Sequence, residues 1–486
     1  MLRVQLIYKF FFKGDFEMYK KISRRDFVKA TAAGSGAVLL AACAPAAAPP
    51  TAVPTAVSAA PAPAGEPVKV TWFVRDDAIV NPWEDKMVAE FNAANPGIVV
   101  EWISGGSGAE REAKFTAMFA GGTPPDVFAS WQEAGFGDYA ARNLMLDLKP
   151  FVDASADLDL STIPKDVMKI YESGGKLLGI PFASGASYLF YNKNAFDEAG
   201  LPYPTTSWDD PTWTWEAWVD LAKKLTKNYG TPDALYGANV GLWPSNAIHG
   251  LFDADLYPPE AYTTGLFTDS PADSENSILA FQSQADLMWK DQVSPSPALA
   301  DAMASVGDPF KTGRIVMNMT GVWGFWAYSD VTAFEIGAAA FPVGKSTNKP
   351  VLFTDPWSVA RETKHPKEAW KFAEVLVDPK RGAKDYMELT GVVPPAAELL
   401  PLWYERMSKR MPWLTSKQLS ELIVGSMQKG GESANHLLIG FNQMESMVSA
   451  ERQAIFLNKA TAAAVMPTIK QKLDEIAAEV NKQFGA

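Results

Sequence analysis

Short apolar runs alternate with segments of helical spacing along the part of the chain that begins at residue 68. β-Branched and aromatic side chains fill residues 68–74, and Met87, Val88 and Phe91 then follow at the spacing of one helix face. The same alternation predicts strands at 68–74, 98–103 and 126–129 and helices at 84–92 and 109–120. Strands that alternate with helices in this way favour an α/β fold, with a largely parallel sheet covered by helices on both faces.

Later apolar runs predict a second group of strands and a helical C-terminal part. The run at 179–182 leads into a strand at 188–192, and a strand at 314–320 is followed by an aromatic loop. We interpret both segments as crossings between two lobes. Helical spacing marks three further stretches, at 366–377, 416–452 and 460–483. The chain has 486 residues, which is too long for one compact core and favours two lobes.

Polar, glycine-rich or aromatic residues lie at the carboxyl ends of the first three predicted strands, where open α/β sheets bind ligands. These residues are candidates for ligand contact: Trp72, Arg75, Asp76, Ser104, Gly105, Ser130, Trp131 and Glu133. Carboxylates can accept hydrogen bonds from neighbouring hydroxyl groups, and an arginine can donate to them. A solvated loop charge is the alternative interpretation of each acidic residue, and core packing is the alternative for each tryptophan.

The first 67 residues have the pattern of an export signal and a linker rather than of a folded domain. Two adjacent arginines, Arg24 and Arg25, precede a modest apolar run, as in a twin-arginine signal, and the sequence LAAC at 40–43 resembles a lipobox. We therefore expect a signal segment at 1–42, a lipid on Cys43, and an extended linker rich in proline and alanine at 43–67. The predicted location is extracytoplasmic, with the lipid anchoring the protein to the cell membrane.

Composition excludes several classes of function. Aspartate and glutamate number 56 against 44 lysines and arginines, a net charge of −12, which argues against a nucleic-acid partner. One cysteine and three histidines argue against a disulfide framework and against a His/Cys metal site. No run of about 18 apolar residues could span a bilayer, and the glycine-rich segment at 105–108 lacks a P-loop lysine and a dinucleotide fingerprint. We therefore expect no metal and no cofactor.

Eight short motifs give a specific resemblance. They stand in this order along the chain: GTPPDV at 122–127, GIP at 179–181, YNKNAF at 191–196, AGLP at 199–202, WEAW at 215–218 with AKKLT at 222–226, FKTGRIVM at 310–317, FPVG at 341–344 and KHPKEAWKF at 364–372. Together they resemble the family 1 extracellular solute-binding proteins, the receptor components of ABC importers, and in particular the maltodextrin-binding group. The resemblance runs from about residue 68 to the C-terminus.

This resemblance implies two α/β lobes of periplasmic-binding-protein type, joined by three crossings, that close on a solute by hinge motion. It places 68–181 and 318–356 in the N-terminal lobe and 182–317 and 357–486 in the C-terminal lobe. The family is not catalytic, so we expect a receptor and not an enzyme. Its partners would be a small-molecule carbohydrate and the transmembrane subunits of an ABC permease, and we expect the receptor to be a monomer.

The chain has 16 tryptophans, and they fall into two groups. Trp208, Trp213, Trp215 and Trp218 surround a predicted helix start, so we expect them to pack that helix against its lobe. Scattered residues are further candidates for the ligand site: Tyr188, Trp243, Trp323, Asp355, Trp357 and Phe441. Among these, Trp323 stands where the family often places an aromatic residue that stacks on a sugar, because indole offers a flat apolar face.

The leading hypothesis from the sequence is a lipid-anchored receptor that captures a sugar or short oligosaccharide in an interlobe cleft and delivers it to a permease. Within the same class, the solute could be a polyol phosphate or a polyamine. An exported carbohydrate-active enzyme is the alternative from another class, and it would need two carboxylates positioned in the cleft. A third hypothesis is a surface adhesion or scaffold protein with a degenerate cleft.

Overall fold

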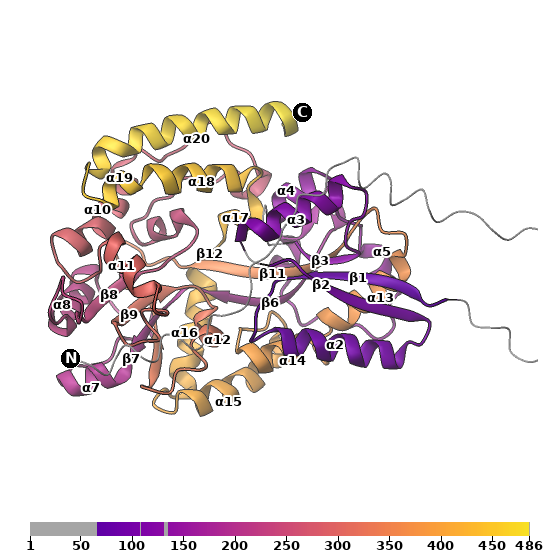
Figure 1. Cartoon of the computed structure of the whole chain (residues 1–486), viewed down its shortest axis with the longest axis horizontal. Helices are drawn as coiled ribbons and strands as arrows, with labels where there is room; N and C mark the ends of the chain where they lie inside the picture. The colour runs from indigo at the N-terminus through magenta and orange to yellow at the C-terminus, as the bar shows by residue number, and fades with distance from the viewer. Residues whose placement is uncertain (1–65, 107, 131–134, 486) are drawn as a thin grey trace, which may run out of the picture. The chain divides into compact units, whose positions relative to one another are not determined.

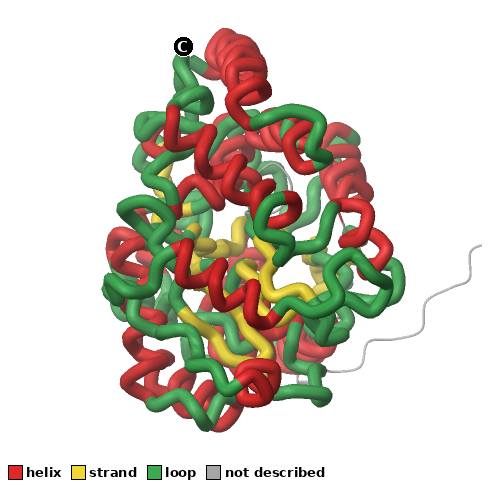
Figure 2. The backbone as a smooth tube through the Cα atoms, turned by 90° about the vertical axis from the view of Figure 1, so that its left-hand side faces the viewer, coloured by secondary structure: helices red, strands yellow, loops and turns green. Residues whose placement is uncertain are grey.

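The computed structural model describes residues 66–106, 108–130 and 135–485. Within these residues the strands form two main sheets, and Figure 2 shows strands flanked by helices and loops. The first sheet has the order β12-β11-β3-β1-β2, and β6 pairs with β11. Its strands are β1 (Val68–Val74), β2 (Ile98–Ser104), β3 (Val127–Ala129), β6 (Ile180–Ala186), β11 (Val351–Val359) and β12 (Gly431–Glu432).

The first three strands follow the sequence prediction closely. β1 runs parallel to β2, with Val68 beside Ile98, and parallel to β3, with Trp72 beside Val127. Helices α2 (Asn81–Ala94) and α3 (Gly108–Ala120) make the two connections, and Figure 1 draws them below and above this part of the sheet. This alternation confirms the predicted α/β fold, and it brings the carboxyl ends of β1, β2 and β3 to one edge.

The second sheet differs from the expectation of a mostly parallel sheet. Its order is β10-β7-β9-β8, with β7 (Tyr188–Asn192), β8 (Tyr236–Val240), β9 (Ile315–Thr320) and β10 (Ile336–Ala339). β7 is antiparallel to both β9 and β10, and β8 alone is parallel to its neighbour β9. A parallel sheet was inferred from the alternation in the first part of the chain, and that alternation does not continue through these strands.

Sheet membership departs from the expected lobe boundaries at two places. Residues 318–340 were assigned to the N-terminal lobe, but β9 ends in the second sheet at Thr320 and β10 pairs with β7 there. Residues 357–377 were assigned to the C-terminal lobe, but β11 pairs with β3 and helix α13 (Pro366–Val377) packs against β1 and β11. β6 leads directly into β7 of the second sheet, and β11 follows β10 of that sheet. The chain therefore passes between the two sheets at the paired strands β6 and β11.

Most predicted helices are present with small differences at their ends. α13 has the predicted bounds, and the last predicted helix is α20 (Ala462–Phe484). The predicted helical region at 416–452 divides into α16 (Ser416–Lys429), β12, α17 (Ala434–Leu437) and α18 (Phe441–Glu451). Further helices are α4 (Phe136–Ala141), α8 (Trp215–Leu225), α10 (Glu275–Trp289), α12 (Gly324–Ala327) and α14 (Gly382–Thr390).

The tryptophans around residue 213 pack α8, as predicted. Thr214 caps the helix, its side chain accepting the N–H of Ala217 at 3.2 Å. The cluster tryptophans are all buried, and the indole N–H of Trp208 donates to the carbonyl of Leu422 at 2.8 Å. These residues therefore stabilise the fold, and the structure confirms the packing interpretation.

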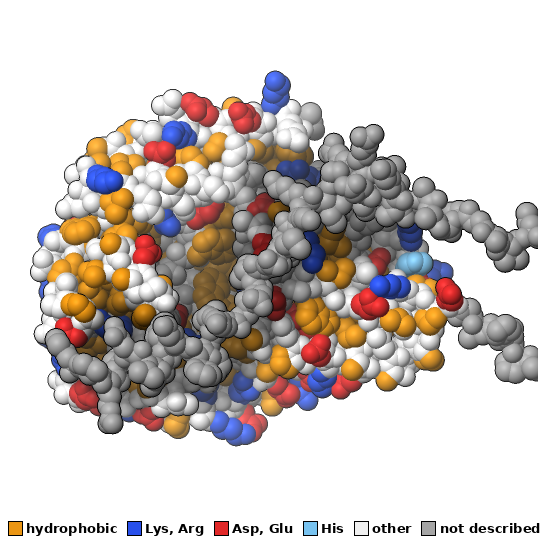
Figure 3. Space-filling view, in the orientation of Figure 1, with side chains coloured by type: hydrophobic (Ala, Val, Ile, Leu, Met, Phe, Trp, Pro, Cys, Tyr) orange, Lys and Arg blue, Asp and Glu red, His pale blue; other side chains and the backbone are white. Residues whose placement is uncertain are grey.

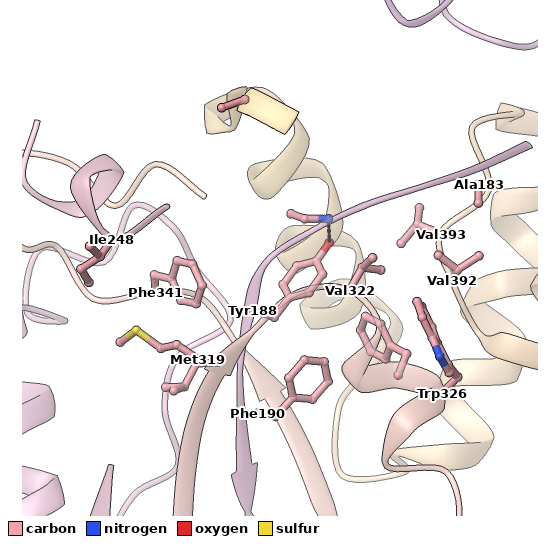
Figure 4. Close-up of a cluster of buried hydrophobic side chains, with 14 of the residues drawn as sticks. Ala183, Tyr188, Phe190, Ile248, Met319, Val322, Trp326, Phe341, Val392 and Val393 are labelled. Carbon is pink, nitrogen blue, oxygen red and sulfur yellow. Dashed lines mark hydrogen bonds between the residues drawn. The ribbon is translucent and has the colours of Figure 1, made fainter. Parts of the chain in front are cut away.

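A buried apolar cluster joins the second sheet to the helices beside it (Figure 4). Tyr188 and Phe190 extend from β7, Met319 from β9, and Val322 and Trp326 from the segment that follows β9. Such close packing holds the segment after β9 in place. Among the residues that the structure describes, there is no helix with the length and apolar character needed to cross a membrane.

Candidate functional site

A cavity of about 510 Å³ collects side chains from segments that follow strands of both sheets and from strand β11 of the first sheet. The residues that line it are Arg75, Asp77, Arg111, Glu112, Trp243, Val322, Trp323, Trp326, Ala327, Phe353, Asp355, Tyr386 and Asn442. They come from the end of β1, the start of α3, the loop after β8, the segment through α12, strand β11, and helices α14 and α18. In the face drawn in Figure 3 the surface is hollowed, with hydrophobic side chains on the floor of the hollow.

Aromatic side chains form one wall of this cavity. The rings of Trp243 and Phe353 are stacked, with centroids 6.3 Å apart and planes 13° apart. Trp323 contacts the same phenyl ring edge-on at 5.1 Å. Trp243 remains 39% exposed, which is unusual for so large an apolar side chain and leaves an aromatic face open to a ligand.

A glycine fixes the position of Trp323. A Cβ atom at Gly321 would lie only 2.2 Å from the indole ring of Trp323, so the ring can lie over this backbone because residue 321 has no side chain. The motif Gly321-Val322-Trp323 therefore sets an aromatic side chain directly after β9. The sequence predicted Trp323 at this site on the family resemblance, and this contact gives the physical reason for its placement.

Charged groups also line the cavity. Arg75 follows the last residue of β1, and Arg111 and Glu112 lie in the first turns of α3. Burial, helped by the nearby positive charge of Arg75, lowers the pKa of Arg111 to about 10. The side chain of Asn442, at the start of α18, donates to Oε1 of Glu112 at 3.0 Å. This hydrogen bond joins two helices that lie far apart in sequence.

Asp355 is a buried carboxylate in the cavity wall. It lies on β11 two residues after Phe353, so both side chains fall on the same face of the strand. Burial raises the pKa of Asp355 to about 7, although the nearby groups His436 and Arg75 lower it. Nε2 of His436 lies 4.0 Å from Oδ1 of Asp355, and Nδ1 of the same ring contacts Oε1 of Glu432. Asp355 can therefore change its charge near neutral pH while it faces the cavity.

The structure brings four of the predicted site residues together in this cavity: Arg75, Trp243, Trp323 and Asp355. Gly105 lies next to the site without lining it, and a Cβ there would lie 2.5 Å from Cγ of Arg111. Gly105 thus gives Arg111 room to reach the cavity. Ser104 accepts a hydrogen bond from the N–H of Gly106 at 3.2 Å, and Asp76 accepts one from Asn81 at 3.0 Å. Both of these side chains act within their own loop.

Other predicted residues lie outside the wall of this cavity because they are packed in the core. Trp72 is fully buried and meets the rings of Trp83, Trp357 and Phe372 edge-on. Ser130 accepts a hydrogen bond from Ser358 at 2.8 Å. The fully buried hydroxyl of Tyr188 pairs with Ser426 at 3.0 Å.

Phe441 has a supporting position. It is buried behind Trp243 and meets that ring edge-on at 6.0 Å. Three predicted residues, Cys43, Trp131 and Glu133, lie outside the residues that the structure describes.

Several residues of the cavity were not candidates from the sequence, among them Arg111, Trp326, Phe353 and Tyr386. Trp326 is three residues from Trp323, which is the helical spacing that α12 uses. Phe353 precedes Asp355 by two residues, so strand alternation could have found it. Arg111 follows a glycine-rich loop, which is a weak signal. No pattern in the sequence marks Tyr386, because α14 reaches the cavity only through tertiary packing.

Comparison with known proteins identifies the family. Residues 76–383 match the family model described as bacterial extracellular solute-binding protein. The chain belongs to this family. Its members are solute receptors rather than enzymes, and the two-domain fold seen here is the fold of the family.

Individual relatives are more distant. The chain is 25% identical over 332 residues to the multiple sugar-binding protein of Streptococcus mutans, an alignment that covers 63% of this chain and 70% of that protein. It is 28% identical over 143 residues to the sn-glycerol-3-phosphate-binding periplasmic protein UgpB of Salmonella paratyphi A, covering 29% of this chain and 32% of that protein. The ABC substrate-binding protein Lmo0181 of Listeria monocytogenes, solved with cycloalternan, superposes with a TM-score of 0.68 at 20% identity, covering 86% of this chain and all of that one.

Proposed function

We propose that this protein is the receptor of an ABC importer and that it binds a sugar or short oligosaccharide reversibly in the cavity of about 510 Å³. The observation that carries the proposal is the pairing of open aromatic faces, Trp243 and Trp323, with charged hydrogen-bonding groups across one cavity. Two relatives support it, since one is named a multiple sugar-binding protein and another was solved with a cyclic oligosaccharide.

The chemistry of a sugar fits both walls. The C–H face of a pyranose ring is apolar and can pack on an indole, which buries surface from both partners. The ring hydroxyls can donate to the carboxylates of Asp77, Glu112 and Asp355 and can accept from Arg75 and Arg111. Ligand binding by such a receptor favours the closed arrangement of its lobes by its differential affinity for that state.

A binding screen tests this proposal. Glucose, maltose, maltotriose, mannobiose and mannotriose would each be titrated into the protein by calorimetry, with tryptophan fluorescence as a second readout. We expect at least one of them to bind, and Trp323→Ala to weaken that binding at least about tenfold through the lost aromatic contact. Trp289→Ala is the control, because Trp289 is an exposed tryptophan (40%) that does not line the cavity. The absence of binding by every sugar would contradict the proposal.

A polyol phosphate is a second candidate solute, favoured by one observation. Arg75 and Arg111 both line the cavity, and guanidinium groups bind phosphate well. Three carboxylates, Asp77, Glu112 and Asp355, line it too, and they oppose a phosphate dianion. sn-Glycerol 3-phosphate in the same calorimetric panel decides between the two classes, and we expect it to bind more weakly than the sugars.

We also infer that the chain is exported through a twin-arginine signal and held at the membrane by a lipid on Cys43. A lipid anchor and the linker at 43–67 would keep the receptor near its permease while leaving it free to collect solute. Fractionation of cells that express Cys43→Ser tests this. We expect the variant to leave the membrane fraction, and a variant that stays in that fraction would contradict the inference.

A further inference from the structure

A second, much smaller cavity adjoins the proposed sugar site. Its volume is about 30 Å³, which is room for at least one water-sized group. Arg75, Asp77 and Tyr386 line both cavities, so these three side chains lie where the two spaces meet. The inner wall of the small cavity includes Glu84, Trp83 and Trp357.

Glu84 occupies a position where a carboxylate is not expected. It lies on α2 and is only 3% exposed, on the face that also buries Trp83, Met87 and Phe91. Charged side chains are almost never buried to this degree without a partner. Among the residues that the structure describes, Oε2 of Glu84 has no hydrogen-bond partner. Such a group in a cavity wall requires a polar occupant or a functional reason.

The charges around Glu84 favour its neutral form. Its pKa is raised to about 8, mainly by burial and also by the nearby aspartates, while Arg75 acts to lower it. The charged or titratable groups that face it come from three elements: Arg75, Asp76 and Asp77 after β1, Asp85 beside it on α2, and Tyr386 on α14. At neutral pH Glu84 is therefore a carboxylic acid, which can both donate and accept a hydrogen bond.

Two indole groups supply donors in the same wall. Nε1 of Trp83 and Nε1 of Trp357 are buried, and each has no hydrogen-bond partner among the described residues. The rings are fixed by their neighbours: Trp83 meets Tyr386 edge-on at 5.0 Å, and Trp357 stacks on Phe182 at 4.8 Å. The wall thus contains two indole N–H groups, which can only donate a hydrogen bond, and one carboxyl group, which can both donate and accept one.

These properties select the chemical group that the small cavity can take. A phosphate or a carboxylate would add negative charge beside Asp77 in a wall that already buries the carboxyl group of Glu84, and an ammonium group could not accept a bond from an indole N–H. A hydroxyl group fits, because it is one heavy atom that accepts from an indole and pairs with the carboxyl group of Glu84.

We propose that the small cavity is the innermost subsite of the sugar site, and that it receives one hydroxyl group of the bound sugar, held by Glu84 together with Trp83 or Trp357. This assignment rests on the proposed function. It makes Glu84 a residue that determines which sugar stereochemistry is accepted, because one ring hydroxyl must point into the subsite.

Calorimetry with deoxy sugars tests the subsite. The probes are the sugar from the panel above that binds most tightly and each of its monodeoxy analogues, titrated into the wild type, Glu84→Leu and Glu90→Leu. We expect one analogue to lose at least about tenfold in affinity for the wild type, and more than the other analogues lose. In Glu84→Leu we expect that difference to shrink, because leucine offers the parent sugar no hydrogen-bonding group. Glu90→Leu is the matched control on an exposed site of the same helix, and it should behave as the wild type.

The pH dependence gives a second readout. Ionisation of Glu84 removes its donor and places a charge beside Asp77 and Asp85, so the affinity of the wild type should fall as the pH rises through about 8. Glu84→Gln should not show this fall.

Three results would overturn the proposal. One is an equal loss for every monodeoxy analogue, and another is the same selective loss in Glu84→Leu as in the wild type. The third is a structure of the sugar complex in which a water molecule fills the subsite. The wild-type series requires no variant, so a misfolded Glu84→Leu would not spare the proposal. If no sugar in the panel binds at all, the proposed function itself fails, and the two failures are thereby distinguished.

Discussion

Asp355 illustrates how one buried side chain can link ligand binding to pH. It lies in the cavity wall with its pKa raised to about 7 by burial, while His436, Glu432 and Arg75 act on it from neighbouring elements. The hydroxyl groups of a sugar donate to an ionised carboxylate more strongly than to a protonated one. Binding should therefore favour ionisation of Asp355 and release a proton when the pH is below about 7.

We predict that sugar affinity rises as the pH increases from about 5 to about 7, and that Asp355→Asn removes this rise. The sign follows from the raised pKa: below it the wild-type carboxyl group is protonated, and ligand binding must first remove the proton. Calorimetric titrations at several pH values, with Asp253→Asn as an exposed control, measure the effect. An unchanged rise in Asp355→Asn would assign the pH dependence to another group.

The residues of the site were only partly predictable from sequence, for a physical reason. Arg75 and Trp323 directly follow strands, and a strand end in an α/β fold has a known relation to the ligand edge. Trp72 looked equivalent, but strand alternation turns its side chain into the core, where three aromatic rings surround it. Tyr386 and Glu84 reach their cavities through packing between helices, which no local pattern encodes.

At the scale of elements, local patterns predicted the strands and helices that depend on near neighbours. β1 and α13 have the predicted bounds, because their apolar periodicity is complete within the segment. The region at 416–452 was expected to be helical throughout, but β12 pairs there with β11, about 80 residues away. The antiparallel pairing of β7 likewise depends on distant strands.

We predict that Gly321→Ala, in the turn between β9 and α12, displaces the ring of Trp323. The added Cβ would lie 2.2 Å from the ring, so the turn or the ring must move, which should cost about 1–3 kcal/mol of stability and weaken sugar binding. Gly97→Ala is a suitable control, because a Cβ there meets no atom within 4 Å. Denaturant unfolding and calorimetry measure the two effects. If Gly321→Ala bound the sugar with wild-type affinity, the position of the Trp323 ring would not contribute to sugar binding.

At the scale of the whole molecule, the cavity draws its walls from segments that follow strands of both sheets and from strand β11 of the first sheet. Binding to the folded protein alone stabilises it by RT ln(1 + [L]/Kd).

We therefore predict that the sugar stabilises the whole described fold against urea, by about 2.7 kcal/mol when its free concentration is 100 times Kd. Urea titrations followed by far-UV circular dichroism and by tryptophan fluorescence should shift together. Trp323→Ala, compared at the same sugar concentration, should show a smaller shift. A shift in fluorescence without one in circular dichroism would mean that the ligand acts only locally.

The hydrogen bond between Asn442 and Glu112 has a consequence for how long a solute stays bound. It joins α3, which follows β2 of the first sheet, to α18, which packs against α20, and it lies in the wall of the cavity itself. A solute that leaves by separation of these helices must break it, and one such bond contributes about 0.5–1.5 kcal/mol. This hydrogen bond would then lower the dissociation rate of the solute and lengthen its residence time severalfold, while the association rate would be nearly unchanged.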